Sequence, residues 1–168
     1  MDPGLDEYYH ISDYPKYVSS TAVLARLLDG LGFRFYWATE GLSPEDYTFR
    51  PAADIKSIEE LTIHVWQLMN WISTGALKAK QYKKPKNGKD AREKTFLIIS
   101  DLKKAMLFMS DEELSQLTLM NKPFWHIING PISDALTHVG QINSFRRLNG
   151  NPCAGANVFK GEPPKVHK

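Results

Sequence analysis

The sequence predicts an all-α fold, a four-helix bundle formed by a single domain over residues 1–168. Apolar residues recur at helical spacing in four long stretches, and helix-capping or helix-stopping residues stand at their ends. No stretch shows the alternation of apolar and polar residues that is typical of a strand. Helices that each carry one apolar stripe bury it against one another, so a bundle is the expected architecture.

The composition is that of an ordinary globular chain. Apolar residues make up 42% of the sequence and charged residues 24%, which excludes the disordered and collagen-like classes. No apolar run approaches the roughly 20 residues of a membrane helix, and the acidic N-terminus lacks a secretory pattern. One cysteine, Cys153, permits no internal disulfide and fits a reducing compartment. We therefore expect a cytoplasmic protein without a membrane partner.

The first helix is expected over about residues 20–40, after an irregular segment at residues 1–19. Gly30 and Gly32 weaken this helix by about 1 kcal/mol each relative to Ala, so tertiary packing has to hold it. Gly41 is expected to end it as a left-handed cap. Its apolar stripe consists of Leu24, Leu27, Leu28, Leu31, Phe35 and Ala38.

The second helix is expected over about residues 57–77. Ser57 and Glu60 fit a capping box, in which each side chain satisfies a free backbone donor of the other residue. Just before it, Ser43–Asp46 predicts a capped single turn with Pro44 in the first helical position. The inner stripe of the second helix consists of Ile58, Leu61, His64, Val65, Leu68 and Ile72.

The third helix is expected over about residues 90–109, with Asp90 and Glu93 repeating the capping pattern. A further capping box from Ser110 to Glu113 predicts a short extra helix. The apolar face of the third helix consists of Phe96, Ile99, Leu102, Met106 and Met109.

The fourth helix is expected over about residues 131–149. Residues 124–128 add a turn upstream, which we expect Gly130–Pro131 to kink away from the helix. The run Gly150–Pro152 is a strong stop signal. The tail over residues 153–168 is rich in Pro, Gly and Lys and is expected to pack as an irregular strap.

The formal charge of +2 is nearly balanced and does not favour a nucleic-acid partner. Lysines nevertheless crowd one stretch, which can be read as a phosphate-binding patch or as a solvated loop between helices. The loop is favoured because Pro85, Asn87 and Gly88 break regular structure and no aromatic ladder accompanies the charges. The lysines are Lys78, Lys80, Lys83, Lys84, Lys86 and Lys89.

Asp134 and His138 form the core of a candidate metal site. They are four positions apart, so on a helix their Cβ atoms lie about 6 Å from each other. Ile142 and Phe145 continue this face, which predicts that the pair points into the core. His64 lies on the inner stripe of another helix, and two histidines with one carboxylate are a known metal-ligand set.

A structural interpretation of the same residues stays open. A lone histidine such as His64 on an apolar face is more often a core residue bonded to a carbonyl or water. An inward Asp134 costs several kcal/mol unless it has a cation, a proton or hydrogen bonds.

Other polar residues are weaker candidates. Gln141 can orient a metal ligand or form a helix-to-helix hydrogen bond. His126 is favoured as a surface histidine over a fourth ligand. Arg146 and Arg147 can bind a substrate carboxylate, although such residues more often favour a helix C-terminus or pair with acids. Cys153 is a poor candidate nucleophile because no histidine is near it in sequence.

The chain resembles the DinB/YfiT superfamily from about Ser20 to Pro152. The most specific element is the H-x-G-Q core of the fourth helix. The likeness rests on His64, on the stretch Ser133–Ile142 (SDALTHVGQI), on Arg146-Arg147 and Gly150–Pro152, and on Gly30–Leu42 (GLGFRFYWATEGL) with Ser43–Pro51 (SPEDYTFRP).

The resemblance implies a four-helix bundle, often dimeric, with one divalent metal ion bound by a histidine of helix two and two ligands of helix four. His64 and His138 match the family positions. Asp134 stands where the family commonly has a histidine, but a carboxylate is also a competent ligand. Zinc or nickel is the favoured metal, and iron or manganese is also compatible.

The resemblance also implies an activity. Three protein ligands leave coordination positions open, as in a catalytic metal site. Members of the superfamily include enzymes that transfer a low-molecular-weight thiol to an electrophile, and this is the preferred function. Hydrolysis of a small ester or amide is the alternative, although no general base stands out beyond the ligands. A non-catalytic metal-binding or interaction bundle is a third possibility.

The departure at Asp134 generates a prediction. Asp134→His restores the commoner family ligand, so we expect the variant to retain the metal that the wild-type protein binds. Metal content by mass spectrometry measures this. A variant without metal would show that the local geometry is adapted to a carboxylate.

Overall fold

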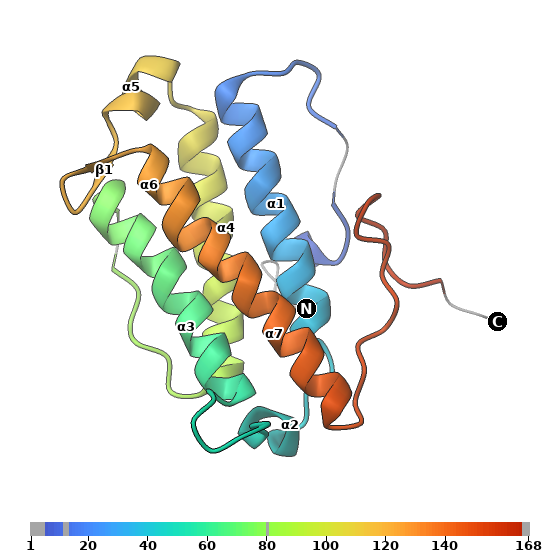
Figure 1. Ribbon diagram of the computed structural model, residues 1–168. Coiled ribbons are helices and arrows are strands. Elements are labelled where there is room, and N and C mark those ends of the chain that lie inside the picture. The colour runs from blue at the N-terminus through green and yellow to red at the C-terminus, as the bar shows by residue number, and fades with distance from the viewer. Residues whose placement is uncertain (1–5, 12–13, 80, 166–168) are drawn as a thin grey trace.

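Four long helices dominate the fold of the protein, for which a computed structural model describes residues 6–11, 14–79 and 81–165. Within these ranges the predicted all-α class is confirmed. α1 packs mainly on α4 and α7, and α3 packs on the same two helices. The long helices lie side by side (Figure 1) and are α1 (Ser20–Thr39), α3 (Ile58–Trp71), α4 (Gly88–Leu107) and α7 (Ser133–Leu148).

The directions of the helices explain the lysine-rich segment. α1 and α7 run in one direction, whereas α3 and α4 run in the other (Figure 1). Because α3 and α4 are parallel, the chain between them has to travel back along the helices before α4 begins. Residues 78–87 make this crossover, in which Lys83, Lys84 and Lys86 are exposed, while Lys80 lies outside the described residues. The favoured interpretation of a solvated inter-helix loop is confirmed for the part that is described.

The core lies between the four long helices. Each of them contributes fully buried apolar side chains, and burying one such side chain stabilises the fold by about 1.5–3 kcal/mol. The innermost residues include Leu28, Leu31 and Phe35 of α1, Val65 and Met69 of α3, Phe96, Ile99 and Leu102 of α4, and Ala135 and Ile142 of α7.

Serine capping boxes set three helix starts, as the sequence predicts. Ser43 caps α2 (Pro44–Thr48), Ser57 caps α3, and Ser110 caps α5 (Asp111–Gln116). In each case the serine hydroxyl accepts a hydrogen bond from the third helical residue, whose carboxylate accepts one from the serine N–H. These helices therefore begin where their capping residues dictate.

The third long helix begins earlier than predicted. Its first residue is Gly88, because the side chain of Asn87 accepts the N–H of Asp90 at 2.9 Å and forms the N-cap. The Asp90 carboxylate accepts the backbone N–H of Lys86 at 2.7 Å. Asp90 thus reinforces the first turn and is not the capping residue itself.

The start of the fourth helix also differs from the prediction. The chain is already helical in α6 (Trp125–Ile127), and a π-helical turn (η3, Ile128–Ile132) leads directly into α7. Pro131 lies inside this turn. Proline lacks an N–H and clashes with the carbonyl four residues earlier, and a wider turn relieves both problems. The expected break at Gly130–Pro131 is therefore replaced by a continuous helical path.

A second π-helical turn extends the helix at residues 57–77. This turn (η2, Ile72–Ala76) follows α3 directly, so the helical path ends one residue short of the predicted boundary. A small hairpin was not predicted. β1 (Thr118–Leu119) pairs with β2 (Lys122–Pro123). Strands of two residues are too short to show alternation.

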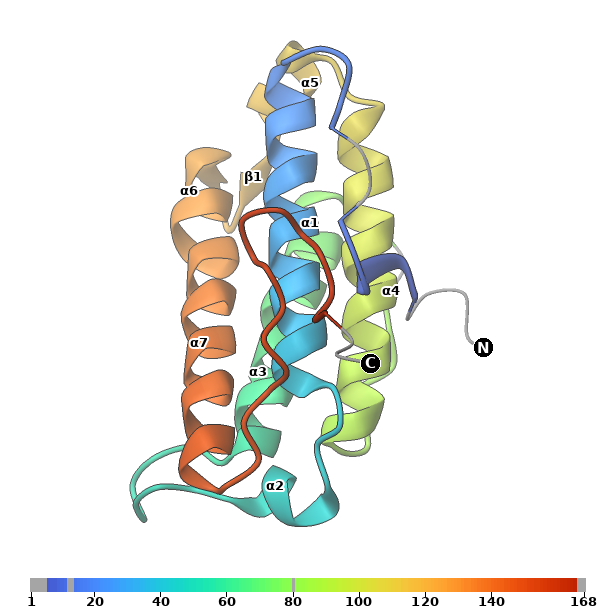
Figure 2. The ribbon, with the colours of Figure 1, turned by 90° about the vertical axis from the view of Figure 1, so that its right-hand side faces the viewer.

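The irregular segments at both ends pack on α1. Tyr8 of the turn η1 (Asp6–Tyr8) is 2% exposed and lies on Gly32, where any Cβ atom would overlap its ring. The N–H of Ile11 donates to the carbonyl of Gly161 at 2.9 Å. Figure 2 shows the C-terminal tail running along α1. Gly32 is therefore required for the close approach of the N-terminal segment.

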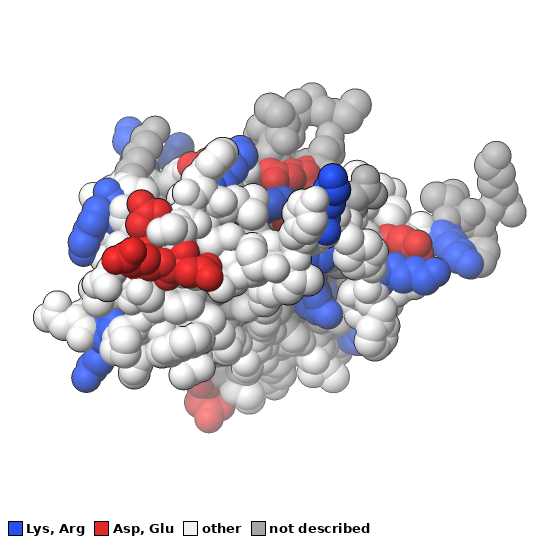
Figure 3. Space-filling model, turned by 90° about the horizontal axis from the view of Figure 1, so that it is seen from above, with Lys and Arg blue, Asp and Glu red and all other residues white. Residues whose placement is uncertain are grey.

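The surface carries mixed charges. Viewed from the α5 end, acidic and basic side chains form small separate groups on a largely uncharged face (Figure 3). Among the described residues, no helix combines the length and the hydropathy that a membrane crossing requires.

A buried arginine joins α7 to the C-terminal end of α1. Arg146 is 2% exposed. Its Nη1 group donates to the carbonyls of Trp37, Ala38 and Glu40 at 3.2, 3.1 and 2.9 Å, and its Nε donates to the carbonyl of Asn151 at 2.6 Å. The last carbonyls of a helix lack partners within the helix and favour a nearby cation. Arg146 therefore caps a helix other than its own.

Asp46 completes this junction from α2. Its carboxylate accepts hydrogen bonds from the N–H of Ser43 and from the side-chain amides of Asn149 and Asn151 at 2.8, 2.8 and 2.6 Å. Burial raises the pKa of Asp46, but these hydrogen bonds outweigh burial, so the pKa is lowered overall. The residues after α7 are thus held against the α1–α2 connection.

Replacing Arg146 tests the junction. We expect Arg146→Met to lower the free energy of unfolding by about 2–4 kcal/mol, because several buried carbonyls lose their donor. Arg147→Met is the matched control, since Arg147 is exposed, and it should change the free energy by less than about 0.5 kcal/mol. Urea unfolding measures both values. Equal effects would show that the buried contacts do not stabilise the fold.

Candidate metal centre

His64, Asp134 and His138 come together at the contact between α3 and α7. One donor atom from each lies within 4.8 Å of the others. The His64 Nε2 atom is 3.6 Å from Asp134 Oδ2, and the His138 Nε2 atom is 3.4 Å from Asp134 Oδ1. The two imidazole rings meet edge to face, with centroids 4.7 Å apart. The structure therefore gathers all three sequence-predicted ligands at one point.

A glutamine side chain contacts each imidazole at Nδ1, the ring nitrogen that does not face Asp134. The Nδ1 atom of His64 is 3.0 Å from Gln67 Oε1, and the Nδ1 atom of His138 is 2.7 Å from Gln141 Oε1. An amide oxygen can only accept, so each Nδ1 carries the hydrogen. The Nε2 atom of a neutral ring then presents its lone pair, and in both residues it faces Asp134. Such hydrogen bonds fix the tautomer and the orientation of metal-binding histidines.

These contacts fit a divalent cation. Two imidazole lone pairs that face a carboxylate repel it unless a positive charge lies between them. Zinc binds nitrogen and carboxylate oxygen at about 2.0–2.2 Å, which at a tetrahedral angle separates two donors by about 3.3–3.6 Å. The Nε2–carboxylate separations of 3.4 and 3.6 Å, which involve different oxygens of Asp134, lie in this range. The full set of three donor atoms lies within 4.8 Å, so the side chains would have to close in slightly around an ion. His64, Asp134 and His138 are thus the residues that would hold the ion.

The cluster lies at the edge of the core and not inside it, which corrects the sequence-based expectation. The exposed fractions are 28% for the His64 side chain, 15% for His138 and 46% for Asp134. On α7 the buried stripe runs through Ala135 and Val139, one position further along the chain. One position turns a helix by about 100°, so the ligands flank the core stripe. Such an edge position is open to solvent.

Gln67 was missed by the sequence reasoning, whereas Gln141 was considered. A signal was present, because each histidine is followed by a glutamine three positions later. Residues three apart on a helix are neighbours, so both pairs were within reach of a spacing argument.

The remaining candidates lie elsewhere. His126 is exposed on α6, outside the cluster. Arg146 is buried in the cap of α1, and Arg147 is exposed on α7. The Cys153 thiol donates to Asn143 Oδ1 at 2.9 Å. Among the described residues these four side chains do not join the three ligands.

Comparison with known proteins adds no family to this geometry. No protein-family model matches the chain, and no curated protein or solved structure gives a significant match.

The glutamine contacts generate a prediction. Gln141→Leu removes the acceptor behind His138, so we expect zinc affinity to fall by about 10- to 100-fold. Gln116→Leu is the control, because Gln116 is an exposed glutamine on α5. Titration against a chromophoric zinc chelator measures both affinities. If the two variants bind zinc equally well, Gln141 does not support His138.

Proposed function

We propose that the protein is a four-helix bundle of the DinB/YfiT type whose His64, Asp134 and His138 hold one divalent metal ion. We further propose that it transfers a low-molecular-weight thiol to an electrophilic small molecule in the cytoplasm. The observation that carries the proposal is the convergence of three donor atoms within 4.8 Å, contributed by two facing helices. Zinc or nickel is the proposed metal.

Two features support the bundle. α1 and α3 each pack on α4 and on α7, so the four helices surround one core. The fourth helix carries the H-x-G-Q core of the resembled family, and the structure gives two of its residues linked positions, since Gln141 bonds His138. The homodimer expected from the resemblance remains a prediction.

The site suits a reacting metal better than a structural one. Three protein ligands leave room for an exogenous ligand, whereas structural zinc sites are usually closed by four. A divalent ion bound in such a site is a Lewis acid that lowers the pKa of a coordinated water or thiol. The exposed edge at Asp134 provides the access that a substrate needs.

The protein residues favour thiol transfer over hydrolysis. Gln67 and Gln141 orient the two imidazoles, and the Asp134 carboxylate offsets part of the charge of the ion. Among the described residues, the cluster has no fourth imidazole or carboxylate that is free to activate a water as general base. A thiol whose pKa the bound ion had lowered would release its proton to solvent at neutral pH without a general base. Its sulfur could then form the bond to the electrophilic carbon as the bond from that carbon to the leaving group breaks, and the leaving group would depart into solvent with the bonding electron pair.

Metal content tests the first part of the proposal. We expect about one metal ion per chain in the untagged wild-type protein and none in His138→Ala or His64→Ala, because two ligands no longer hold the ion tightly. His126→Ala is the matched control and should keep its metal. Mass spectrometry gives the content, and circular dichroism should show unchanged helicity, since both ligands lie outside the core. Full occupancy in the His138 variant, or no metal in any protein after loading, would refute the proposed site.

A thiol panel completes this test. Glutathione, cysteine and coenzyme A are compared with their S-methyl derivatives by thermal shift of the metal-loaded protein. A free thiol that binds the site should raise Tm, and its S-methyl derivative should not. The rise should disappear in His138→Ala. Equal shifts for thiol and S-methyl derivative would argue against thiol transfer, and a loaded protein that responds to none would be assigned to the non-catalytic class.

A further inference from the structure

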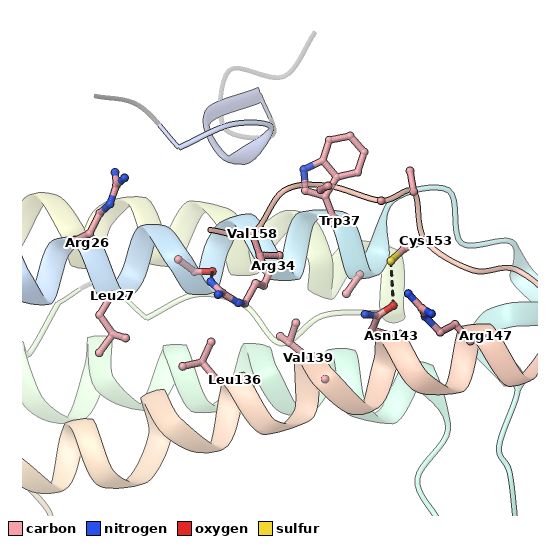
Figure 4. A pocket seen from close by; sticks show the side chains of 16 residues that line it. Arg26, Leu27, Arg34, Trp37, Leu136, Val139, Asn143, Arg147, Cys153 and Val158 are labelled. Carbon is pink, nitrogen blue, oxygen red and sulfur yellow. Dashed lines mark hydrogen bonds between the residues drawn. The ribbon is translucent and has the colours of Figure 1, made fainter. Parts of the chain in front are cut away.

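A cavity lies between α1, α7 and the C-terminal tail. Its volume is about 760 Å³, which is within the range of about 300–1,000 Å³ that small-molecule sites occupy. Figure 4 shows the cavity between the two helices, with the tail crossing over one side.

The walls of this cavity are mainly apolar. Leu27 and Ala38 line it from α1, Leu136 and Val139 line it from α7, and Val158 closes it from the tail. Apolar walls of this kind bind the hydrocarbon part of a small molecule. The cavity therefore suits a ligand with an apolar body.

Two arginines give the cavity a positive charge. Arg34 of α1 and Arg147 of α7 both line it, and within the described part of the chain no aspartate or glutamate does. Arg34 donates through Nη1 to the carbonyl of Gly30 at 3.2 Å, which leaves most of its N–H groups available. Among the described residues, neither arginine has a carboxylate within ion-pair distance. A third arginine, Arg26, lies over the ring of Tyr14 and is not needed here.

Arginine side chains without acidic partners beside apolar walls favour the binding of an anion. Guanidinium binds carboxylate and phosphate groups through paired hydrogen bonds. Arg34 turns back toward Gly30, whereas Arg147 lies toward the other end of the cavity, beyond Asn143 (Figure 4). We propose that this cavity binds a small organic anion, with its acidic group at Arg34 and its apolar body against Leu136 and Val139.

This site is separate from the candidate metal centre. The metal ligands Asp134 and His138 face α3, whereas Leu136 and Val139 line the cavity beside α1. The two sites therefore use different faces of the same helix, and binding at one does not require the residues of the other.

Cys153 offers a reporter at the cavity. It lines the cavity and is the single cysteine of the chain. Its alkylation by iodoacetamide therefore reports on this location alone. A ligand seated beneath the tail should slow the reaction.

The experiment compares 2-naphthoate with its neutral isostere 2-naphthamide and with inorganic phosphate. Calorimetry gives the affinities, and the rate of Cys153 alkylation gives the location. We expect naphthoate to bind about tenfold or more tightly than the other two and to slow alkylation, because only naphthoate can pair with Arg34 and also contact the apolar walls. Arg34→Met should weaken naphthoate binding by about tenfold, and Arg147→Met, which removes a more distant charge, should weaken it less.

Matched variants keep this test decisive. Lys104→Met removes one charge from an exposed position on α4, and it should leave the affinity for naphthoate unchanged. Arg34→Gln removes the same charge but keeps a polar side chain, so it remains informative even if Arg34→Met does not fold. His138→Ala should also retain naphthoate binding, whatever the fate of the metal.

Four results would overturn the proposal. They are absence of naphthoate binding, equal binding of naphthamide or phosphate, unchanged affinity in the Arg34 variants, and loss of naphthoate binding in His138→Ala. The last would mean that the carboxylate binds at the metal centre instead of at the arginines.

Discussion

The guanidinium group of Arg146 fixes the relation between the first and the last long helix. It reaches across from α7 to three carbonyls at the end of α1 and also binds Asn151, which follows α7. A cation buried to this degree is tolerated only where its hydrogen bonds are satisfied. Its fork of donors accepts few alternative arrangements, so the position of α7 along α1 is set at this end.

Both candidate sites depend on this placement. α7 supplies two metal ligands on one face and the wall of a cavity on another. A shift of α7 along its axis would move Asp134 and His138 relative to His64 on α3, and would move Arg147 relative to Arg34 on α1. Tight packing of the core stripe transmits such a shift to both faces at once. The positions of the residues in both candidate sites therefore depend on the contacts of Arg146.

Much of the helical layout could be predicted from the sequence because its signals are local. Ser57 and Ser110 cap helices within three residues of themselves, and the apolar stripes repeat every three or four positions. The start of α4 was misplaced because its N-cap, Asn87, lies in a segment with Pro85 and Gly88 whose composition is typical of a loop. The path through Pro131 was misjudged because proline usually ends a helix, whereas here the π-helical turn accommodates it.

The convergence of His64, Asp134 and His138 was also predictable, but their position at the edge of the core was not. Helix spacing placed His138 beside Asp134. It did not fix the rotation of α7 about its axis, which depends on which of its adjacent apolar faces packs against the other helices. The role of Arg146 depends on partners more than 100 residues away, which no local pattern reveals.

The π-helical turn at Ile128–Ile132 affects how this chain can change in length. A π turn holds about one residue more than an α turn over the same rise. The segment therefore stores a spare residue just upstream of Asp134. Deleting Pro131 would remove both this residue and the reason for the wider turn, so the segment could become regular α-helix while α7 keeps its rotational phase and Asp134 and His138 keep their positions.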